Sequence, residues 1–150
     1  MSKEFYQVLK ERRTVYAISK EAVTTDEVIK DVIEKAVLHT PSAFNSQTAR
    51  LVVLWKNEHD RFWDITRENL RKIVPADSFQ STDEKITSFQ NGYATVLFFE
   101  DQDVVKGLQE AFPLYSQNFP VRSQQSSGMH QYVVWSALEL EGYGASLQHH

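Results

Sequence analysis

Residues 40–55 read TPSAFNSQTARLVVLW, so that a polar loop leads directly into an apolar run. The loop carries serine hydroxyls, two side-chain amides and the Arg50 guanidinium, which together supply hydrogen-bond donors and acceptors. Leu51–Trp55 is rich in β-branched and bulky residues without alternation, and this pattern predicts a strand covered on both faces. Because regular elements hold such a loop in place, it is a candidate binding site.

The side chains of this loop suit a flat heteroaromatic ligand better than a nucleophilic reaction. Ser42, Asn45, Ser46 and Gln47 can pair with alternating donors and acceptors along the edge of a ring. The chain has no cysteine, and no histidine and carboxylate stand close enough in sequence to suggest a triad. The alternative is that the Pro-Ser and Asn-Ser pairs only make turns and cap neighbouring elements.

Helical spacing of apolar residues predicts two helices before the loop. The first covers residues 3–13. Thr24 and Glu27 have the spacing of a capping box and predict the start of the second helix, which ends at His39 because Pro41 disfavours a helical residue before it. His39 is then a helix-terminal residue.

After the loop, the sequence predicts a polar turn over 57–60 with His59 in solvent, and then a helix over 60–73. Residues 75–91 are rich in turn formers and predict a loop with a short helix. Residues 94–99 form the second apolar strand pattern. Three acids follow it, Glu100, Asp101 and Asp103. Two carboxylates one residue apart could suggest a divalent metal, but no further ligand that would join such a pair is in view, so a solvated turn is the better fit.

The last third of the chain predicts a partial helix over 104–115, interrupted by Pro113, and a polar segment that leads into a helix over 129–140. That helix is apolar nearly all round, which indicates either the central helix of a monomer or a helix shared between subunits. Gly142 and Gly144 are expected to end it, and residues 145–148 to begin a third strand.

Composition limits the classes of protein. The formal net charge is −4, and Lys and Arg are scattered, which argues against a nucleic-acid-binding surface. No apolar run approaches the roughly 20 residues of a membrane span, and the start does not resemble a secretion signal. We therefore expect a single domain over residues 1–150 in the cytoplasm, with no membrane partner.

Three motifs occur in a characteristic order: ERRTVY at 11–16, Pro-Ser-x-x-Asn-x-Gln at 41–47 and EGYGASLQH at 141–149. With these three motifs in this order, the chain resembles the FMN-dependent nitroreductase family, in particular its short-chain branch linked to oxidative stress and fatty-acid repression. The resemblance covers essentially the whole chain. It implies an α+β fold with a central, mainly antiparallel sheet flanked by helices, and a homodimer with FMN at the interface. Family members continue beyond the last motif, so it also implies that the C-terminal part of the fold is missing.

The resemblance implies which residues bind FMN. An arginine fork pairs well with phosphate oxygens, although Arg12 and Arg13 also suit the exposed end of a helix. Asn69 and Lys72 project from one side of their helix, where an ordinary polar face is the alternative. The full set of expected FMN contacts is Arg12, Arg13, Thr14, Tyr16, Pro41, Ser42, Phe44, Asn45, Gln47, Asn69, Lys72, Leu147, Gln148 and His149, with Asn45 and Gln47 delivered from the opposite subunit.

The implied activity is the reduction of a small-molecule electron acceptor, a nitroaromatic or quinone, with NADH or NADPH as donor and ping-pong kinetics. No catalytic side chain is expected, because flavin N5 carries the hydride and the protein supplies position and electrostatics. The alternative is a flavin-free regulatory or interaction protein on the same dimeric scaffold.

Overall fold

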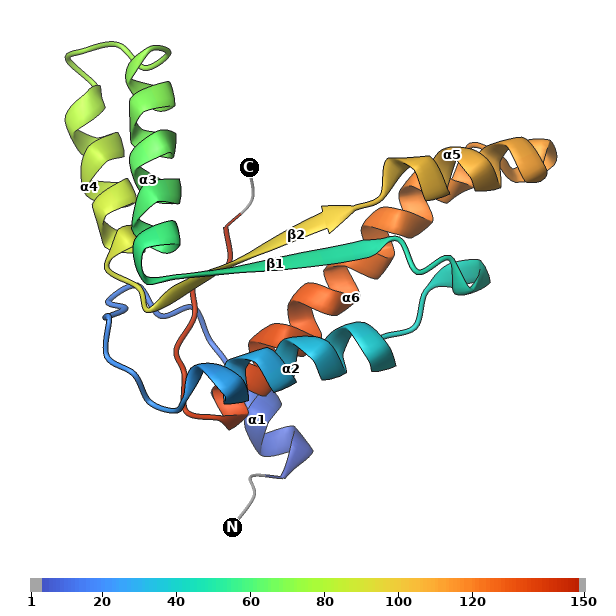
Figure 1. Ribbon diagram of the computed structural model, residues 1–150, viewed down its shortest axis with the longest axis horizontal. Helices are drawn as coiled ribbons and strands as arrows, with labels where there is room; N and C mark the ends of the chain where they lie inside the picture. The colour runs from blue at the N-terminus through green and yellow to red at the C-terminus, as the bar shows by residue number, and fades with distance from the viewer. Residues whose placement is uncertain (1–3, 149–150) are drawn as a thin grey trace.

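The computed structural model of the chain describes residues 4–148. Its longer elements, in chain order, are α1 (Phe5–Glu11), α2 (Asp26–His39), β1 (Ala49–Trp55), α3 (Lys56–Arg71), α4 (Phe79–Gln90), β2 (Ala94–Glu100), α5 (Gln102–Ala111) and α6 (Asn118–Leu140) (Figure 1). Two short 3-10 helices are η1 (Ala43–Asn45) and η2 (Pro113–Tyr115). No helix within 4–148 is long and apolar enough to cross a membrane.

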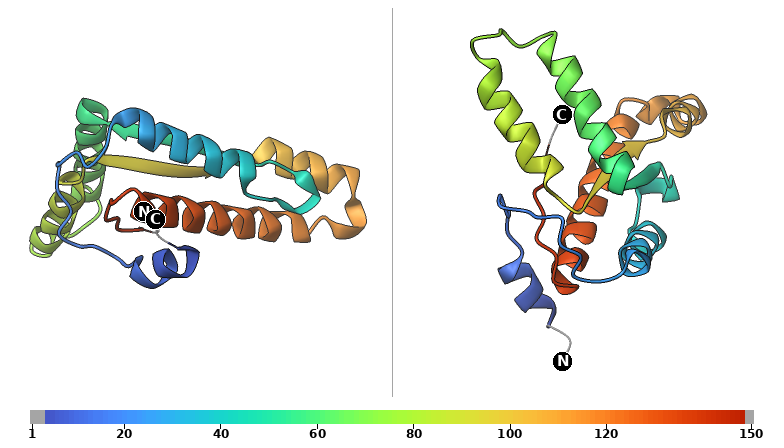
Figure 2. Two further views of the ribbon diagram at one scale, coloured as in Figure 1. Left: turned by 90° about the horizontal axis from the view of Figure 1, so that it is seen from below. Right: turned by 60° about the vertical axis from the view of Figure 1, so that its left-hand side comes forward.

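The core lies between a two-stranded sheet and two long helices. Strands β1 and β2 pair antiparallel, from Ala49 opposite Glu100 to Trp55 opposite Ala94. Side chains of both strands pack on buried Ile29 and Ile33 of α2 and on Val134 of α6. Helix α6 runs along most of the long axis of the molecule (Figure 2). The predicted α+β architecture with an antiparallel sheet flanked by helices is confirmed.

Several local predictions are corrected. Helix α1 is shorter than predicted, and Arg12 is its C-cap. The capping box is wrong: Thr25 is the N-cap of α2 without a side-chain bond, and Thr24 hydrogen-bonds the Tyr143 hydroxyl. Strand β1 is not covered on both faces within one chain, since Val52 is 43% exposed.

Helices α3 and α4 form a hairpin that projects from one end of the sheet (Figure 1). The predicted turn at 57–60 is absent, because α3 begins directly after β1 with a φ of 50° at Lys56. The predicted loop with a short helix at 75–91 contains helix α4, which is longer than predicted and leaves only a short connection before it. Ile86 of this helix is buried, and Phe89 packs on Trp63 of α3. Tertiary packing thus overrides local propensity here.

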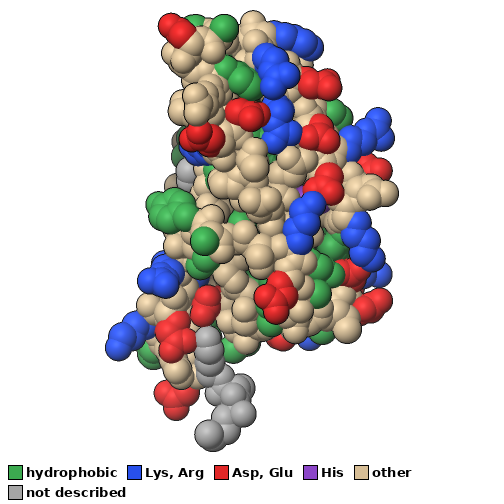
Figure 3. Space-filling model, turned by 90° about the vertical axis from the view of Figure 1, so that its left-hand side faces the viewer, with side chains coloured by type: hydrophobic (Ala, Val, Ile, Leu, Met, Phe, Trp, Pro, Cys, Tyr) green, Lys and Arg blue, Asp and Glu red, His purple; other side chains and the backbone are tan. Residues whose placement is uncertain are grey.

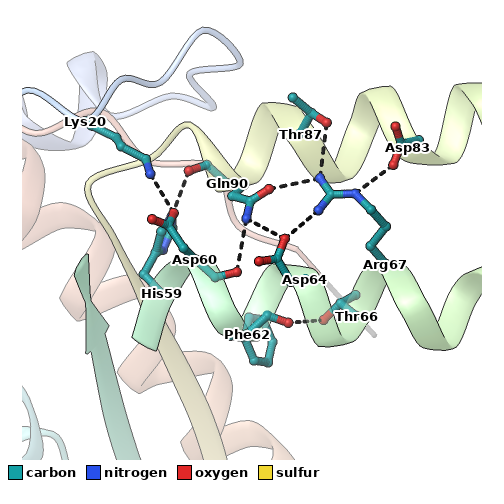
Figure 4. A network of polar contacts seen from close by, with 10 residues as sticks. All are labelled: Lys20, His59, Asp60, Phe62, Asp64, Thr66, Arg67, Asp83, Thr87 and Gln90. Carbon is teal, nitrogen blue, oxygen red and sulfur yellow. Dashed lines mark hydrogen bonds and ion pairs between the residues drawn. The ribbon is translucent and has the colours of Figure 1, made fainter. Parts of the chain in front are cut away.

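Arg67 holds the hairpin together (Figure 4). Its guanidinium donates to Asp83 at 2.7 Å, to Asp64 at 2.8 Å and to the side-chain oxygen of Gln90 at 2.9 Å. The Gln90 amide in turn donates to Asp64 at 2.9 Å. Figure 3 shows acidic and basic side chains interspersed over this part of the surface.

His59 is not in solvent, as the sequence predicts, but is only 1% exposed. Its Nδ1 lies 2.8 Å from the Thr95 hydroxyl, and its Nε2 lies 3.0 Å from the Gln90 carbonyl oxygen. The Trp63 indole also donates to the Thr95 hydroxyl, at 3.0 Å. One imidazole therefore joins the base of α3, the end of α4 and strand β2.

Helix α6 begins eleven residues before the predicted start at 129, since it runs from Asn118 to Leu140. Pro120 lies in its first turn, where backbone N–H groups have no intrahelical partner and proline is tolerated. The helix ends at Leu140, and Gly142, just after the C-cap Glu141, has a φ of 91°. The Tyr143 N–H donates to the Leu138 carbonyl at 2.9 Å, and the Gly142 N–H to the Glu139 carbonyl at 3.1 Å. This is a Schellman motif, which confirms the predicted glycine stop.

The predicted third strand at 145–148 does not form within the described residues. A single parallel bridge instead joins Ala145 to Thr14.

Tyr93 and Asp26 tie β2 to the start of α2, and this contact predicts a pH dependence. The Tyr93 hydroxyl donates to the Asp26 carboxylate at 2.5 Å. This hydrogen bond, with burial and the nearby negative charge, raises the pKa of Tyr93 from 10.0 to about 12. The folded state therefore favours neutral Tyr93, and its stabilising contribution is complete below pH 10 and is lost as pH rises towards 12.

The same bond lowers the pKa of Asp26 below its usual 3.8, with further help from Lys56. Its contribution is therefore lost as pH falls through that lowered value. Tyr93→Phe should reduce both the alkaline and the acid dependence of the denaturant midpoint. Tyr115→Phe, which changes a half-exposed tyrosine of η2, is the control and should leave the denaturant midpoint unchanged at acid and at alkaline pH. The same pH dependence of the midpoint in Tyr93→Phe and in the parent chain would show that the contact carries no such linkage.

Candidate functional site

The N-terminal and C-terminal motifs lie side by side. Thr14 and Ala145 form the parallel bridge, in which the Val15 N–H donates to the Ala145 carbonyl at 3.0 Å. Gly144 makes this approach possible, because a Cβ there would lie 2.9 Å from Val15 Cγ2 and 3.1 Å from Val15 Cβ. Only glycine fits so close to a branched side chain. The structure thus places the end of the arginine motif, at Thr14 and Val15, beside Gly144 and Ala145 of the glycine motif.

Arg12 lies against two aromatic rings of α6. Its guanidinium carbon is 4.1 Å from the centre of the Trp135 ring and 5.6 Å from that of Tyr132. The Arg12 Nε is buried and has no hydrogen-bond partner among the described residues. Arg13 is exposed, and Tyr16 is 79% exposed. The arginine is therefore stacked and partly desolvated, unlike the freely solvated helix-end cation of the alternative interpretation.

Residues 41–47, which we call the amide loop, have an unusual backbone. Phe44, Asn45 and Gln47 have φ values of 61°, 48° and 50°. This left-handed region is uncommon for residues other than glycine, and a bulky residue there is an outlier. Such conformations persist where surrounding contacts fix them, and they gather at functional sites.

Side-chain contacts within the loop and with residues of neighbouring elements fix its conformation. The Gln47 N–H donates to the Ser42 hydroxyl at 3.0 Å, and the Gln47 amide donates to Asn45 Oδ1 at 3.2 Å. The Phe44 ring lies 5.4 Å from the rings of both Phe112 and Phe119. The serine makes a turn, as the alternative interpretation requires. The exposed Asn45 and Gln47 side chains also remain accessible to a ligand.

The base of the amide loop is anchored by the half-buried carboxylate of Glu100. Glu100, at the end of β2, accepts hydrogen bonds from the hydroxyls of Thr48 and Ser123, the latter at 2.5 Å. The neighbouring Asp101 pairs with Arg50 at 3.0 Å and caps the start of α5. These acids thus have structural partners, and within the described residues no three His, Asp or Glu side chains gather as metal ligands.

The amide loop and Arg12 lie at different parts of α6 within one chain. Arg122, over the Phe44 ring at 5.2 Å, and Trp135, under Arg12, are thirteen residues apart in this helix. At the rise of an α-helix this is roughly 20 Å. A single chain therefore does not bring the two predicted parts of the site together.

The structure places the remaining predicted residues in three different surroundings. Leu147 and Gln148 line a pocket of about 660 Å³ between β2, α6 and the segment after Thr14, together with Trp135. Asn69 and Lys72 lie at the far end of α3, where the Lys72 ammonium is 3.3 Å from Asn69 Oδ1, apart from both arginine and amide loop. Pro41 is exposed at the start of the amide loop, and His149 lies outside the described residues.

Sequence reasoning missed the aromatic supports of the site. Tyr132 and Trp135 hold Arg12, and Phe112, Phe119 and Arg122 hold Phe44. The spacing of three between Tyr132 and Trp135 places both rings on one side of a helix, so this pair was visible as a common face. The contact of these two rings with Arg12 could not be predicted from spacing, because it joins residues more than a hundred positions apart in the sequence.

Comparison with known proteins agrees with this geometry. The model of the nitroreductase family matches residues 9–150. The nitroreductase FRM2 of Saccharomyces cerevisiae is 32% identical over 149 residues, which cover 97% of this chain and 74% of the relative.

Solved structures give the same result. Nitroreductase CinD from Lactococcus lactis, in complex with chloramphenicol, superposes with a TM-score of 0.86 at 42% identity, over 97% of this chain and 74% of that one. A nitroreductase of Saccharomyces cerevisiae superposes with a TM-score of 0.85 at 30% identity, over 97% of this chain and 79% of that one. The chain belongs to the nitroreductase family, and this membership supports an oxidoreductase activity.

Proposed function

We propose that this chain is an FMN-dependent NAD(P)H oxidoreductase that reduces nitroaromatic or quinone acceptors as a homodimer. The observation that carries the proposal is the Thr14–Ala145 pairing, since it sets the arginine motif beside the glycine motif. The related CinD, 42% identical, has been solved in complex with 4-nitrophenol, which supports a nitroaromatic acceptor.

The residues at this pairing fit the groups of a flavin mononucleotide. Arg12 offers a planar donor fork for phosphate oxygens, and its buried, unpartnered Nε is the kind of donor that an anion would satisfy. Arg13 and Thr14 would add donors to the phosphate. Backbone groups near Leu147 and Gln148 would lie beside the ring, where the glycine-permitted approach leaves no bulky side chain in the way.

The amide loop of the second protomer would complete the site. Asn45 and Gln47 each donate and accept, so they match the alternating groups on the pyrimidine edge of the ring. Amide donors there stabilise the negative charge that reduction places on that edge. When bound, FMN supplies the hydride chemistry at N5, between NADH or NADPH and the acceptor.

Subunit complementation tests this arrangement. Arg12→Ala and Asn45→Ala each remove one half of every site in their homodimers, so each variant alone should bind FMN weakly in an equilibrium titration. After the two purified variants exchange subunits, each mixed dimer has one site with both residues intact. Binding at the parent affinity should therefore reappear in the mixture, together with NADH or NADPH oxidation in the presence of 4-nitrophenol.

The control is a mixture of Arg12→Ala with Arg13→Ala, which change the same part of the site and cannot restore a complete phosphate contact. If the parent chain binds no FMN, the flavin assignment is wrong and the flavin-free regulatory alternative gains support. If both variants bind FMN weakly but mixing restores nothing, the site does not draw on two protomers.

A further inference from the structure

Trp135 contacts both parts that one protomer contributes to the proposed site, which are Arg12 and the pocket beside the glycine motif. The guanidinium of Arg12 stacks at 4.1 Å from its ring, and the same ring lines the 660 Å³ pocket with Leu147 and Gln148. Trp135 sits on α6, five residues before the end of the helix, and its neighbour Val134 is 3% exposed in the core. The ring is therefore attached to a helix that is packed into the core.

Arg12 lacks other restraints on its side chain. It is the C-cap residue of a seven-residue helix, and among the described residues no hydrogen bond or ion pair of its guanidinium is recorded beyond the two aromatic contacts. An arginine has many rotamers, and ordering it on binding a phosphate costs entropy. A cation over an indole face is the strongest of the cation–π arrangements, and it leaves the in-plane N–H donors of the guanidinium free.

We propose that Trp135, assisted by Tyr132, is the positioning residue that orients Arg12 for the phosphate of the flavin. The stack holds the guanidinium plane before the ligand arrives, so the entropy of ordering Arg12 is already lost in the free protein. This inference rests on the proposed function. Trp135 itself makes no contact with phosphate and contributes only through Arg12.

The test compares FMN with riboflavin, which has the same ring but no phosphate. Trp135→Leu should weaken FMN binding about tenfold more than it weakens riboflavin binding, because Trp135 lines the pocket for both ligands but only the phosphate contact depends on Arg12. Trp135→Phe keeps a ring face and should fall between Trp135→Leu and the parent chain. Tyr115→Phe removes only a hydroxyl from a half-exposed ring that has no recorded contact with Arg12 among the described residues, and is the matched control with unchanged affinity.

A double-mutant cycle separates positioning from packing. In the Arg12→Ala background, Trp135→Leu should weaken FMN binding no more than it weakens riboflavin binding, since the group that it orients is gone. Equal losses for FMN and riboflavin, or full additivity with Arg12→Ala, would overturn the inference and assign Trp135 a structural role. If Trp135→Leu does not fold, Trp135→Phe gives the same two comparisons.

The outcome for the parent chain distinguishes the two proposals. Failure of the parent to prefer FMN over riboflavin would count against the proposed phosphate site itself. A clear preference in the parent that Trp135→Leu retains would count only against the role of Trp135.

Discussion

Replacing His59 with alanine is expected to lower the free energy of unfolding by about 3 kcal/mol. Two effects add. The side chain is 1% exposed, so its removal leaves a cavity at the junction of α3, α4 and β2. The Thr95 hydroxyl and the Gln90 carbonyl also lose a partner in a place that water does not reach. An unsatisfied buried polar group costs about 1–3 kcal/mol.

Denaturant unfolding followed by circular dichroism at pH 8 measures this loss. His39→Ala is the matched control: it removes the same side chain from the exposed end of α2 and should change stability by less than about 0.5 kcal/mol. His59→Gln retains a donor and an acceptor and should recover part of the loss. A stability of His59→Ala within error of the control would mean that the hairpin base does not depend on the imidazole.

Replacing Gly144 with alanine is expected to separate the two motifs that build the phosphate end of the proposed site. The new methyl group would lie 2.9 Å from Val15 Cγ2 and 3.1 Å from Val15 Cβ. A β-branched side chain has one strongly preferred rotamer in a given backbone, so Val15 cannot simply turn away. The backbone pairing must shift instead, and overpacking of this kind costs typically about 1–3 kcal/mol.

FMN affinity should therefore fall by at least about tenfold in Gly144→Ala, since 1.4 kcal/mol corresponds to a factor of ten. The measurement is an equilibrium titration with FMN and, in parallel, thermal unfolding without ligand. Gly107→Ala is the control, because a Cβ at Gly107 meets no atom within 4 Å and alanine favours its helix. Retained FMN affinity in Gly144→Ala would show that the Thr14–Ala145 pairing is not part of the binding site.

The elements with a strong apolar period were predictable from sequence. The stripe of α2, the two apolar strands and the glycine stop of α6 follow directly from spacing and from residues with special backbone freedom. Helix α4 was predicted only as a short helix within a loop, because its polar face is stabilised by Arg67 from another helix. His59 was misplaced for a similar reason: its neighbours in sequence are polar, but its partners are Thr95 and the carbonyl of Gln90.

The candidate site was predictable in its residue types and only partly in its geometry. The motifs identified Arg12 and the amide loop, and the structure pairs Thr14 with Ala145 and places Trp135 against both Arg12 and the pocket that Leu147 and Gln148 line. The left-handed backbone at Phe44, Asn45 and Gln47 could not be read from the sequence, since none of these residues is glycine. It depends on ring contacts with Phe112 and Phe119, which are formed only when the chain folds.

Helix α6 supports Arg12 near one end and the Phe44 cluster near the other. An α-helix turns by about 100° and advances about 1.5 Å per residue. One residue inserted between Arg122 and Tyr132 would rotate the α6 residues that contact Arg12 by about 100° relative to those that contact Phe44. Both groups could then no longer face their partners. The number of residues in this stretch is therefore constrained by two separate contacts, in addition to the burial of Ser123, Ser126 and His130 within it.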